Sequence, residues 1–195
     1  MTSLDFTRGA RGYLRAADML AVAPIPDEAT GFEVRFREPI TTAGHWCPAA
    51  GRASAEAVAT LSVARPGGTD PWLFLPDPGN RPLRSLEEVP ELEFTSAATM
   101  TSGGLLCRLA GGVGFWDQLI AFIRVGGQAL YPERRWQVAA LALSCWPLPP
   151  VLADRMLSLQ IARSRGAYVT LRFALDGCEH GTVGLFAMGR GQPRG

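Results

Sequence analysis

Alternating apolar and polar residues predict antiparallel strands in the last third of the chain. The alternation runs from Met156 to Arg163, breaks at Arg165-Gly166, and returns over 169–175. It breaks again at Asp176-Gly177 and returns over 183–187. A period of two is that of a strand with one face on a core, and short turns of this composition join hairpins. We therefore expect consecutive antiparallel hairpins in this region.

A helix that is apolar on nearly all sides is predicted upstream of these strands. It opens at the run Gly111-Gly112-Val113-Gly114 and ends at Gly126-Gly127, because glycine is common at helix ends. A helix without a polar face is normally buried, so we expect this one to lie inside the protein. A strand over 136–145 then follows. The apolar positions of the helix are Phe115, Trp116, Leu119, Ile120, Phe122, Ile123 and Val125.

The N-terminal half carries weaker signals of the same kinds. An Ala- and Leu-rich segment over 13–23 predicts a short helix, and clean alternation over 31–37 predicts a strand. Residues 55–64 suit either a helix or a strand, and 72–75 suit a short strand. No internal repeat is evident, and these strands are open to interpretation as part of a second, degenerate half.

The order of these elements predicts an α+β fold. One buried helix followed by meandering strands requires the antiparallel sheet to wrap around a long central helix, which is the hot-dog architecture. The chain has 195 residues, of which 47% are hydrophobic and 19% are charged, so it can bury one substantial core. We expect a single hot-dog-like domain over 1–195, with 1–110 a divergent N-terminal half and 111–188 the clearest hot-dog segment.

Charge and composition exclude several classes of function. The formal net charge is +1 and every basic residue is Arg, so no global field attracts nucleic acid or an anionic membrane. The N-terminus lacks the apolar run of a secretory signal, and no stretch approaches the roughly 18 apolar residues that span a bilayer. We therefore expect a soluble, cytoplasmic protein with no nucleic-acid and no membrane partner.

The cysteines and histidines give no support for a metal site. The cysteines are widely spaced, and the two histidines belong to no short cluster of ligands. We expect reduced, structural cysteines, no metal and no cofactor. The residues concerned are Cys47, Cys107, Cys145, Cys178, His45 and His180.

Two segments carry a resemblance to a known family. The run from Gly112 to Leu119, Gly-Val-Gly-Phe-Trp-Asp-Gln-Leu, resembles the start of the central helix in the bacterial 3-hydroxyacyl-acyl-carrier-protein dehydratases, including their dehydratase/isomerase branch. The segment 156–188 resembles the closing strands of the same family. The resemblance covers 111–188 and implies an acyl-phosphopantetheine substrate on an acyl carrier protein or on coenzyme A. A hot-dog sheet also leaves an edge strand and half a ligand tunnel exposed, so we expect a homodimer.

The resemblance also implies the candidate site. It makes Asp117 the match for the catalytic acid of the family, and Gly112 the match for its thioester-binding backbone amide. We add Val113 and Trp116 as substrate-binding residues. The chemistry agrees with this placement, because a helix N-terminus offers N–H groups to a thioester carbonyl and the first turn holds a carboxylate close to it.

The sequence departs from the family at one position. The family pairs its acid with a histidine on the loop before the helix, and that position is Gly103 here. The other candidate is His45, in a Gly-His-Trp segment far upstream of Asp117, and it is included as a catalytic candidate. Three functions stay open: a 3-hydroxyacyl dehydratase or isomerase of fatty-acid or polyketide biosynthesis, a thioesterase that uses Asp117, and a non-catalytic acyl-binding protein.

Overall fold

The computed structural model describes residues 7–8, 14–39, 41–50, 54–77, 79, 84–85, 98–102, 104–130 and 132–188. Its main elements are α1 (Ala16–Ala21), β2 (Gly31–Phe36), β3 (Gly44–Pro48), β4 (Ala59–Arg65), β5 (Gly68–Pro76), β7 (Thr99–Thr101), β8 (Gly104–Arg108), α3 (Phe115–Leu130), β9 (Arg135–Leu143), β10 (Met156–Arg165), β11 (Tyr168–Leu175) and β12 (Cys178–Met188). A 3-10 turn spans Ser54–Glu56, and β1 (Thr7–Arg8) pairs in parallel with β6 (Arg84–Ser85).

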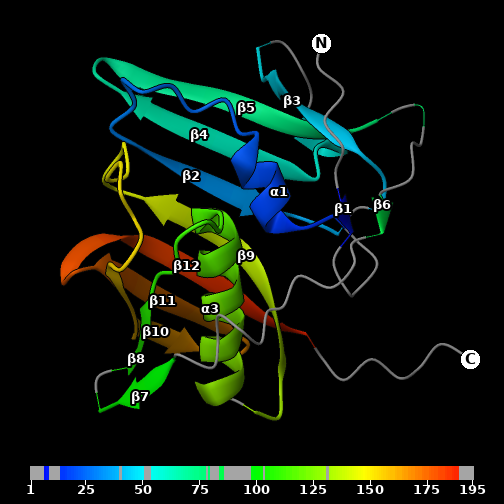
Figure 1. The fold of residues 1–195 in the computed structure, drawn as a ribbon. Helices are drawn as coiled ribbons and strands as arrows, with labels where there is room; N and C mark the ends of the chain where they lie inside the picture. The colour runs from blue at the N-terminus through cyan, green and yellow to red at the C-terminus, as the bar shows by residue number, and fades with distance from the viewer. Residues whose placement is uncertain are drawn as a thin grey trace, which may run out of the picture.

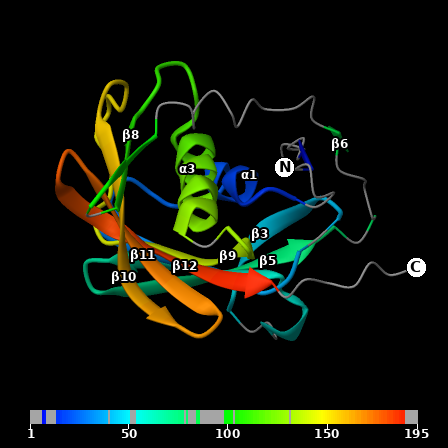
Figure 2. The same ribbon diagram turned by 90° about the horizontal axis from the view of Figure 1, so that it is seen from below.

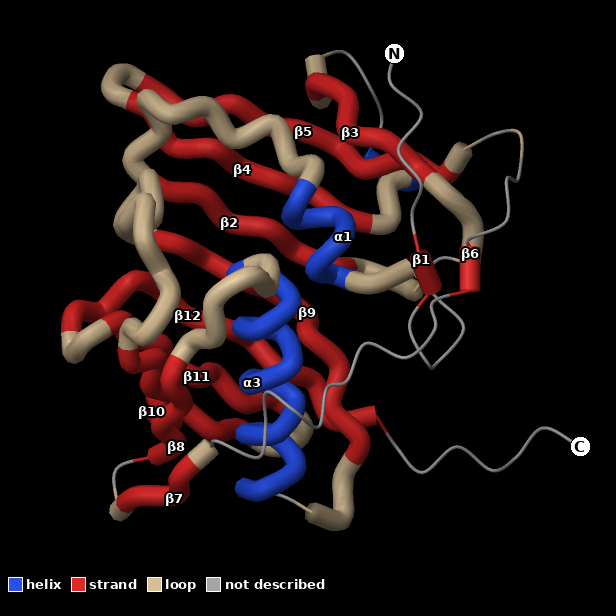
Figure 3. The backbone as a smooth tube through the Cα atoms, in the orientation of Figure 1, coloured by secondary structure: helices blue, strands red, loops and turns tan. Residues whose placement is uncertain are grey.

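One antiparallel sheet organises the described part of the chain. Its ten strands follow the order β3-β5-β4-β2-β9-β12-β11-β10-β8-β7. Helices α1 and α3 lie on the same face of this sheet (Figures 1 and 3). Among the described residues, no helix combines the length and the apolar character needed to cross a bilayer.

The C-terminal half of the sheet has a recognisable topology. The chain runs through β8, α3 and β9, and then through the consecutive strands β10, β11 and β12. Leu157 pairs with Leu175 and Leu171 pairs with Val183, which confirms the hairpins expected from the alternation. The sheet curves around α3 (Figure 2). In the hot-dog arrangement, a helix lies on the concave face of an antiparallel sheet and follows the first of its strands along the chain. Here α3 comes after β8 and before β9 in the sequence.

Helix α3 differs from the expected helix in length and in surroundings. It spans 16 residues and is not clearly the long central helix that the sequence predicts. Leu119, Phe122 and Ile123 are buried in the core, whereas Trp116 and Ile120 are only half-buried at its margin. The helix therefore packs on the sheet with one face and is not wrapped on all sides.

The glycine pair Gly126-Gly127 does not end the helix, contrary to the sequence-based expectation. A Cβ on Gly126 would lie 3.3 Å from Leu159 Cδ1, and a Cβ on Gly127 would lie 2.9 Å from Trp136 Cδ1. The missing side chains let the last turns of α3 approach the sheet closely. Here glycine serves close packing, which the sequence pattern does not distinguish from a helix stop.

The N-terminal half extends the same sheet through β2, which pairs antiparallel with β9. Val34 lies opposite Leu141 in this central pair, and both side chains are fully buried. Strands β4, β5 and β3 continue outward from β2. The ambiguous segment 55–64 resolves into the 3-10 turn and strand β4, and the short helix α1 lies against α3. One buried core cluster thus includes residues of both halves.

Candidate functional site

The N-terminal end of α3 is the place where the candidate residues gather. The N–H of Gln118 donates to the carbonyl of Gly114 at 3.1 Å, so the first helical residue is Phe115. The backbone N–H groups of the first turn of a helix have no acceptor within the helix. Just before it, Gly112 has a φ of +77° and open space around the position of a Cβ. This left-handed conformation favours glycine and keeps the backbone accessible.

The side chain of Gln118 holds the segment before the helix in place. It is buried, with 5% of its surface exposed. Its Oε1 accepts from the Ala110 N–H at 2.7 Å, and its Nε2 donates to the carbonyls of Ala110 at 3.0 Å and Val113 at 3.1 Å. Three hydrogen bonds from one buried amide fix the path of the chain around Gly112. Gln118 is a residue that sequence reasoning missed, although an amide in the most apolar part of the helix was a visible signal.

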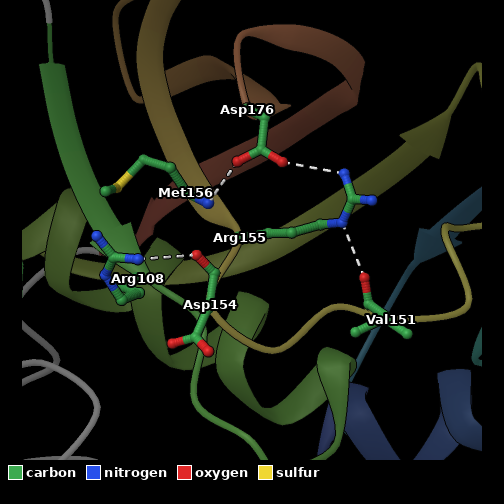
Figure 4. A network of polar contacts seen from close by, with 6 residues as sticks. All are labelled: Arg108, Val151, Asp154, Arg155, Met156 and Asp176. Atoms are coloured by element: carbon green, nitrogen blue, oxygen red, sulfur yellow. Dashed lines mark hydrogen bonds and ion pairs between the residues drawn. The ribbon is translucent and has the colours of Figure 1, made fainter.

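The turn at residues 151–155, just before β10, supports the same segment. The Leu109 N–H donates to Arg155 O and the Asp154 N–H donates to Leu109 O, each at 2.9 Å. Arg155 donates to Val151 O at 2.8 Å and pairs with Asp176 at 3.0 Å, while Asp176 accepts from the Met156 N–H at 2.8 Å. Figure 4 shows the contacts of Arg155 and Asp176, together with Arg108, which donates to Asp154 O at 3.2 Å. The backbone that leads into α3 is therefore hydrogen-bonded, through Leu109, to the residues just before β10.

Asp117 lies in the first turn of α3, with about a third of its side chain exposed (32%). Its Oδ1 accepts a hydrogen bond from Arg15 Nη2, and the two side chains form an ion pair. Its Oδ2 lies over the helix start, because a Cβ on Gly114 would be only 2.9 Å from it. No hydrogen bond to Oδ2 is formed within the described part of the chain. Among these residues, the carboxylate is thus anchored through Oδ1, and Oδ2 accepts no hydrogen bond.

The other substrate-binding candidates flank Asp117 and the helix start. Val113 and Trp116 are half-buried, and Gly112 is exposed. The Trp116 ring contacts Phe115 and Phe32 edge to face, with centroid distances of 5.0 and 5.9 Å. The structure therefore brings Gly112, Val113, Trp116 and Asp117 to one end of α3.

His45 does not join this group. It lies within β3 and not in a loop as the sequence suggested. The next residue, Trp46, donates its Nε1–H to Met19 O of α1 at 3.0 Å, so Trp46 faces the helices. Neighbouring residues of a strand point to opposite faces, and the His45 side chain therefore lies on the other face of the sheet from α3. Gly103, where the family histidine is expected, lies outside the described residues.

The described cysteines and metal-binding side chains give little support for other chemistry. Cys107 of β8 is buried, and burial raises the pKa of its thiol, which makes it a poorer nucleophile at neutral pH. Within the described ranges, no three His, Cys, Asp or Glu side chains are grouped as a metal site. The site therefore consists of a carboxylate, a guanidinium and the backbone at the start of α3.

Comparison with known proteins supports the fold. No family model matches the chain, and no curated protein matches it either. Among solved structures, a tesB protein from Mycobacterium avium subs paratuberculosis is 11% identical, with a TM-score of 0.50 over 95% of this chain and 91% of that one. A conserved protein of unknown function with hot dog fold from Alicyclobacillus acidocaldarius is 11% identical, with a TM-score of 0.44 over 90% and 86%. An acyl-ACP thioesterase from Bacteroides thetaiotaomicron is 8% identical, with a TM-score of 0.43 over 93% of each chain.

At these identities the comparisons show the fold alone. Of the three structures, the tesB protein has a TM-score of 0.50, and the strand order of this chain is that of a hot-dog fold. They do not show membership of the dehydratase family that the run 112–119 resembles. The function is therefore argued from the site.

Proposed function

We propose that this chain hydrolyses acyl thioesters at the N-terminal end of α3, with Asp117 as the general base. One observation carries the proposal. The Asp117 carboxylate is tied to Arg15 through Oδ1, and its Oδ2 lies over the helix start without a hydrogen bond from the described residues. A guanidinium pairs with the ionised form of a carboxylate, and the ionised form is the one that accepts a proton from water.

The proposed reaction uses a carboxylate, backbone N–H groups and a water molecule. The thioester carbonyl accepts hydrogen bonds from backbone N–H groups at the start of α3, where the helix dipole also favours developing negative charge. Asp117 takes a proton from water as the water oxygen attacks the carbonyl carbon. The carbon–sulfur bond then breaks, and the thiolate leaves and takes up the proton. The products are a free acid and a free thiol.

Dehydration of a 3-hydroxyacyl thioester makes a further demand on the site. A second base must remove the proton next to the thioester carbonyl. His45 faces the opposite side of the sheet, and Gly103 has no side chain to supply that base. Hydrolysis is therefore the better supported of the reactions expected from the sequence.

The substrate class and the assembly belong to the same proposal. The resemblance of the run 112–119 to acyl-carrier-protein dehydratases supports an acyl-phosphopantetheine substrate, on an acyl carrier protein or on coenzyme A. We also propose a homodimer, because the sheet ends in the edge strands β3 and β7, and edge strands favour pairing with another chain.

The test separates the possible reactions by their products. The protein is incubated with saturated acyl and with 3-hydroxyacyl coenzyme A thioesters, and free coenzyme A and enoyl product are measured by chromatography. Hydrolysis gives free coenzyme A from both substrates. Asp117→Asn keeps the shape of the side chain but cannot act as a base, so kcat should fall at least about a hundredfold.

The matched control is Asp27→Asn, which changes an exposed carboxylate of a turn. It should hydrolyse the substrate at the wild-type rate. Normal turnover by Asp117→Asn would assign the carboxylate a structural role. Enoyl product in place of free coenzyme A would favour dehydration, and binding without turnover in wild type would favour a non-catalytic acyl-binding protein.

A further inference from the structure

Arg15 reaches the candidate site from the N-terminal half of the chain. It is the residue immediately before α1, with an extended backbone (φ −77°, ψ 137°). Helix α1 lies beside the N-terminal part of α3 in Figures 1 and 3, and the two helices contact each other. This placement puts the Arg15 guanidinium at the first turn of α3, although 102 positions separate Arg15 from Asp117.

Two carboxylates hold the guanidinium. Arg15 Nη2 donates to Asp117 Oδ1, and Arg15 Nη1 lies 3.5 Å from Asp18 Oδ1, one turn along α1. The Arg15 side chain is mostly buried, with 20% of its surface exposed, and that of Asp18 is 21% exposed. A guanidinium is planar and offers its donors in a fixed fork. Contacts on both sides therefore restrict the direction from which Arg15 meets Asp117.

The contact also determines where the second oxygen of Asp117 points. Oδ1 is held by Arg15, and Oδ2 lies over Gly114. Without the guanidinium, the carboxylate is free to rotate and to turn either oxygen toward solvent. We propose that Arg15 is a positioning residue for the hydrolysis: it holds Asp117 by Oδ1 so that Oδ2 faces the water that attacks the thioester. This role rests on the proposed function.

A purely structural role accounts less well for the geometry. The region of Arg15 is already held by the buried apolar residues Leu14, Met19 and Leu20 and by the hydrogen bond from Trp46 to Met19 O. Partly exposed ion pairs add little to stability beyond such packing. The consequence for function is that residues of both halves build the site, although the catalytic candidate lies in the C-terminal half.

The experiment compares three substitutions at Arg15 with a control arginine. Arg15→Gln removes the charge. Arg15→Lys keeps the charge but lacks the planar guanidinium with its fixed pair of donors, and Arg15→Ala leaves space for an added guanidinium ion. The control is Arg65→Gln, because Arg65 also bridges two carboxylates, Glu28 at 3.4 Å and Asp70 at 2.7 Å, at the β4–β5 turn. Release of coenzyme A from octanoyl- and palmitoyl-coenzyme A gives kcat and KM, and thermal unfolding gives Tm.

The proposal predicts a specific loss in kcat. Arg15→Gln should lower kcat at least about tenfold with little change in KM, because a misplaced base affects the chemical step. Arg15→Lys should recover part of the loss, and millimolar guanidinium should raise kcat of Arg15→Ala. Arg65→Gln should keep the wild-type kcat, and Tm should change to a similar small extent in Arg15→Gln and Arg65→Gln.

Each other outcome overturns a defined part of the reasoning. Wild-type kcat in Arg15→Gln, while Asp117→Asn is inactive, overturns the role of Arg15 and leaves the proposed hydrolysis intact. A loss of kcat that follows Tm and is not recovered by guanidinium assigns Arg15 a structural role and also overturns the proposal. If wild type releases no coenzyme A, the proposed hydrolysis fails and the role of Arg15 fails with it.

Discussion

Replacement of Gly114 by alanine should move the Asp117 carboxylate without changing its chemistry. A Cβ at this position would lie 2.9 Å from Asp117 Oδ2 and 3.9 Å from its Cγ, whereas ordinary Cβ contacts begin at 3.4 Å. The oxygen must therefore retreat by about half an ångström. Because this atom is the end of a flexible side chain, the carboxylate can rotate away at small cost to the fold.

The expected magnitude follows from that displacement. Misplacing a reacting group by about 1 Å costs up to about a hundredfold in rate, so half that displacement should lower kcat about tenfold. Alanine is less favourable than glycine just before a helix, but it also restricts the unfolded chain, so the free energy of unfolding should change by less than about 1 kcal/mol. The loss should thus appear in turnover and not in stability.

The matched control is Gly111→Ala. Its Cβ would lie 3.7 Å from Ala153 Cβ, which is ordinary contact, and neither Gly111 nor Gly114 has a left-handed φ. Both variants are assayed by chromatographic measurement of coenzyme A release, because thiol reagents would also label the exposed Cys145 and Cys178. Equal kcat values for the two variants would refute the argument that the position of the Asp117 carboxylate limits turnover.

Three other measurements test the fold and the assembly. Phe122→Ala should lower the free energy of unfolding by about 3 to 5 kcal/mol, since Phe122 is 2% exposed; a loss below about 1 kcal/mol in denaturant titration would contradict its place in the core. Gln118→Leu should destabilise the protein by about 1 to 3 kcal/mol, because it removes three hydrogen bonds that the buried amide makes to the backbone of Ala110 and Val113; an unchanged unfolding midpoint would show that the amide is dispensable. Sedimentation at micromolar concentration should show a dimer, and a stable monomer of 20.9 kDa would count against the proposed assembly.

Local patterns in the sequence predict the strands of this protein well. Strands β2, β11 and β12 follow runs of period two, and the side chains that alternate into the core are the buried ones. In β10 this holds only as far as Leu159, because the strand is exposed from Gln160 onward and Ile161 is 46% exposed. The turns at Gly166 and Gly177 have positive φ, 59° and 83°, so glycine there does mark the hairpins. These features depend on neighbours in sequence, which is why they are visible without a structure.

Features that depend on distant contacts were not predictable in the same way. Gly126-Gly127 has the composition of a helix end, but its role depends on Trp136 and Leu159, which only the fold brings near. His45 follows a glycine in a region without clear alternation, and its strand was not expected. The Arg15 contact with Asp117 has no local signal at all. Asp117 was predicted from the resemblance to a family, whereas its partner Arg15 is visible only in the structure.

The two halves of the sheet differ in the order in which the chain connects their strands. Outward from the pair β2–β9, the strands of one half follow the order β2, β4, β5, β3, and those of the other follow β9, β12, β11, β10, β8, β7. The strand beside β9 is thus the last of its half, whereas the strand beside β2 is followed by β5. A search of the sequence for segments in the same order therefore has no simple repeat to detect.

The pairing of β2 with β9 has a consequence for the synthesis of the protein. The paired residues Val34 and Leu141 are roughly a hundred residues apart, so β2 leaves the ribosome long before its partner exists. During that interval the nascent chain carries a strand with an unpaired edge and an apolar face, which is the kind of segment that aggregates or recruits chaperones. Final assembly of the sheet must wait until β9 has emerged. Slow or paused translation between residues 65 and 135 should therefore lower the yield of folded protein more than a pause after residue 188.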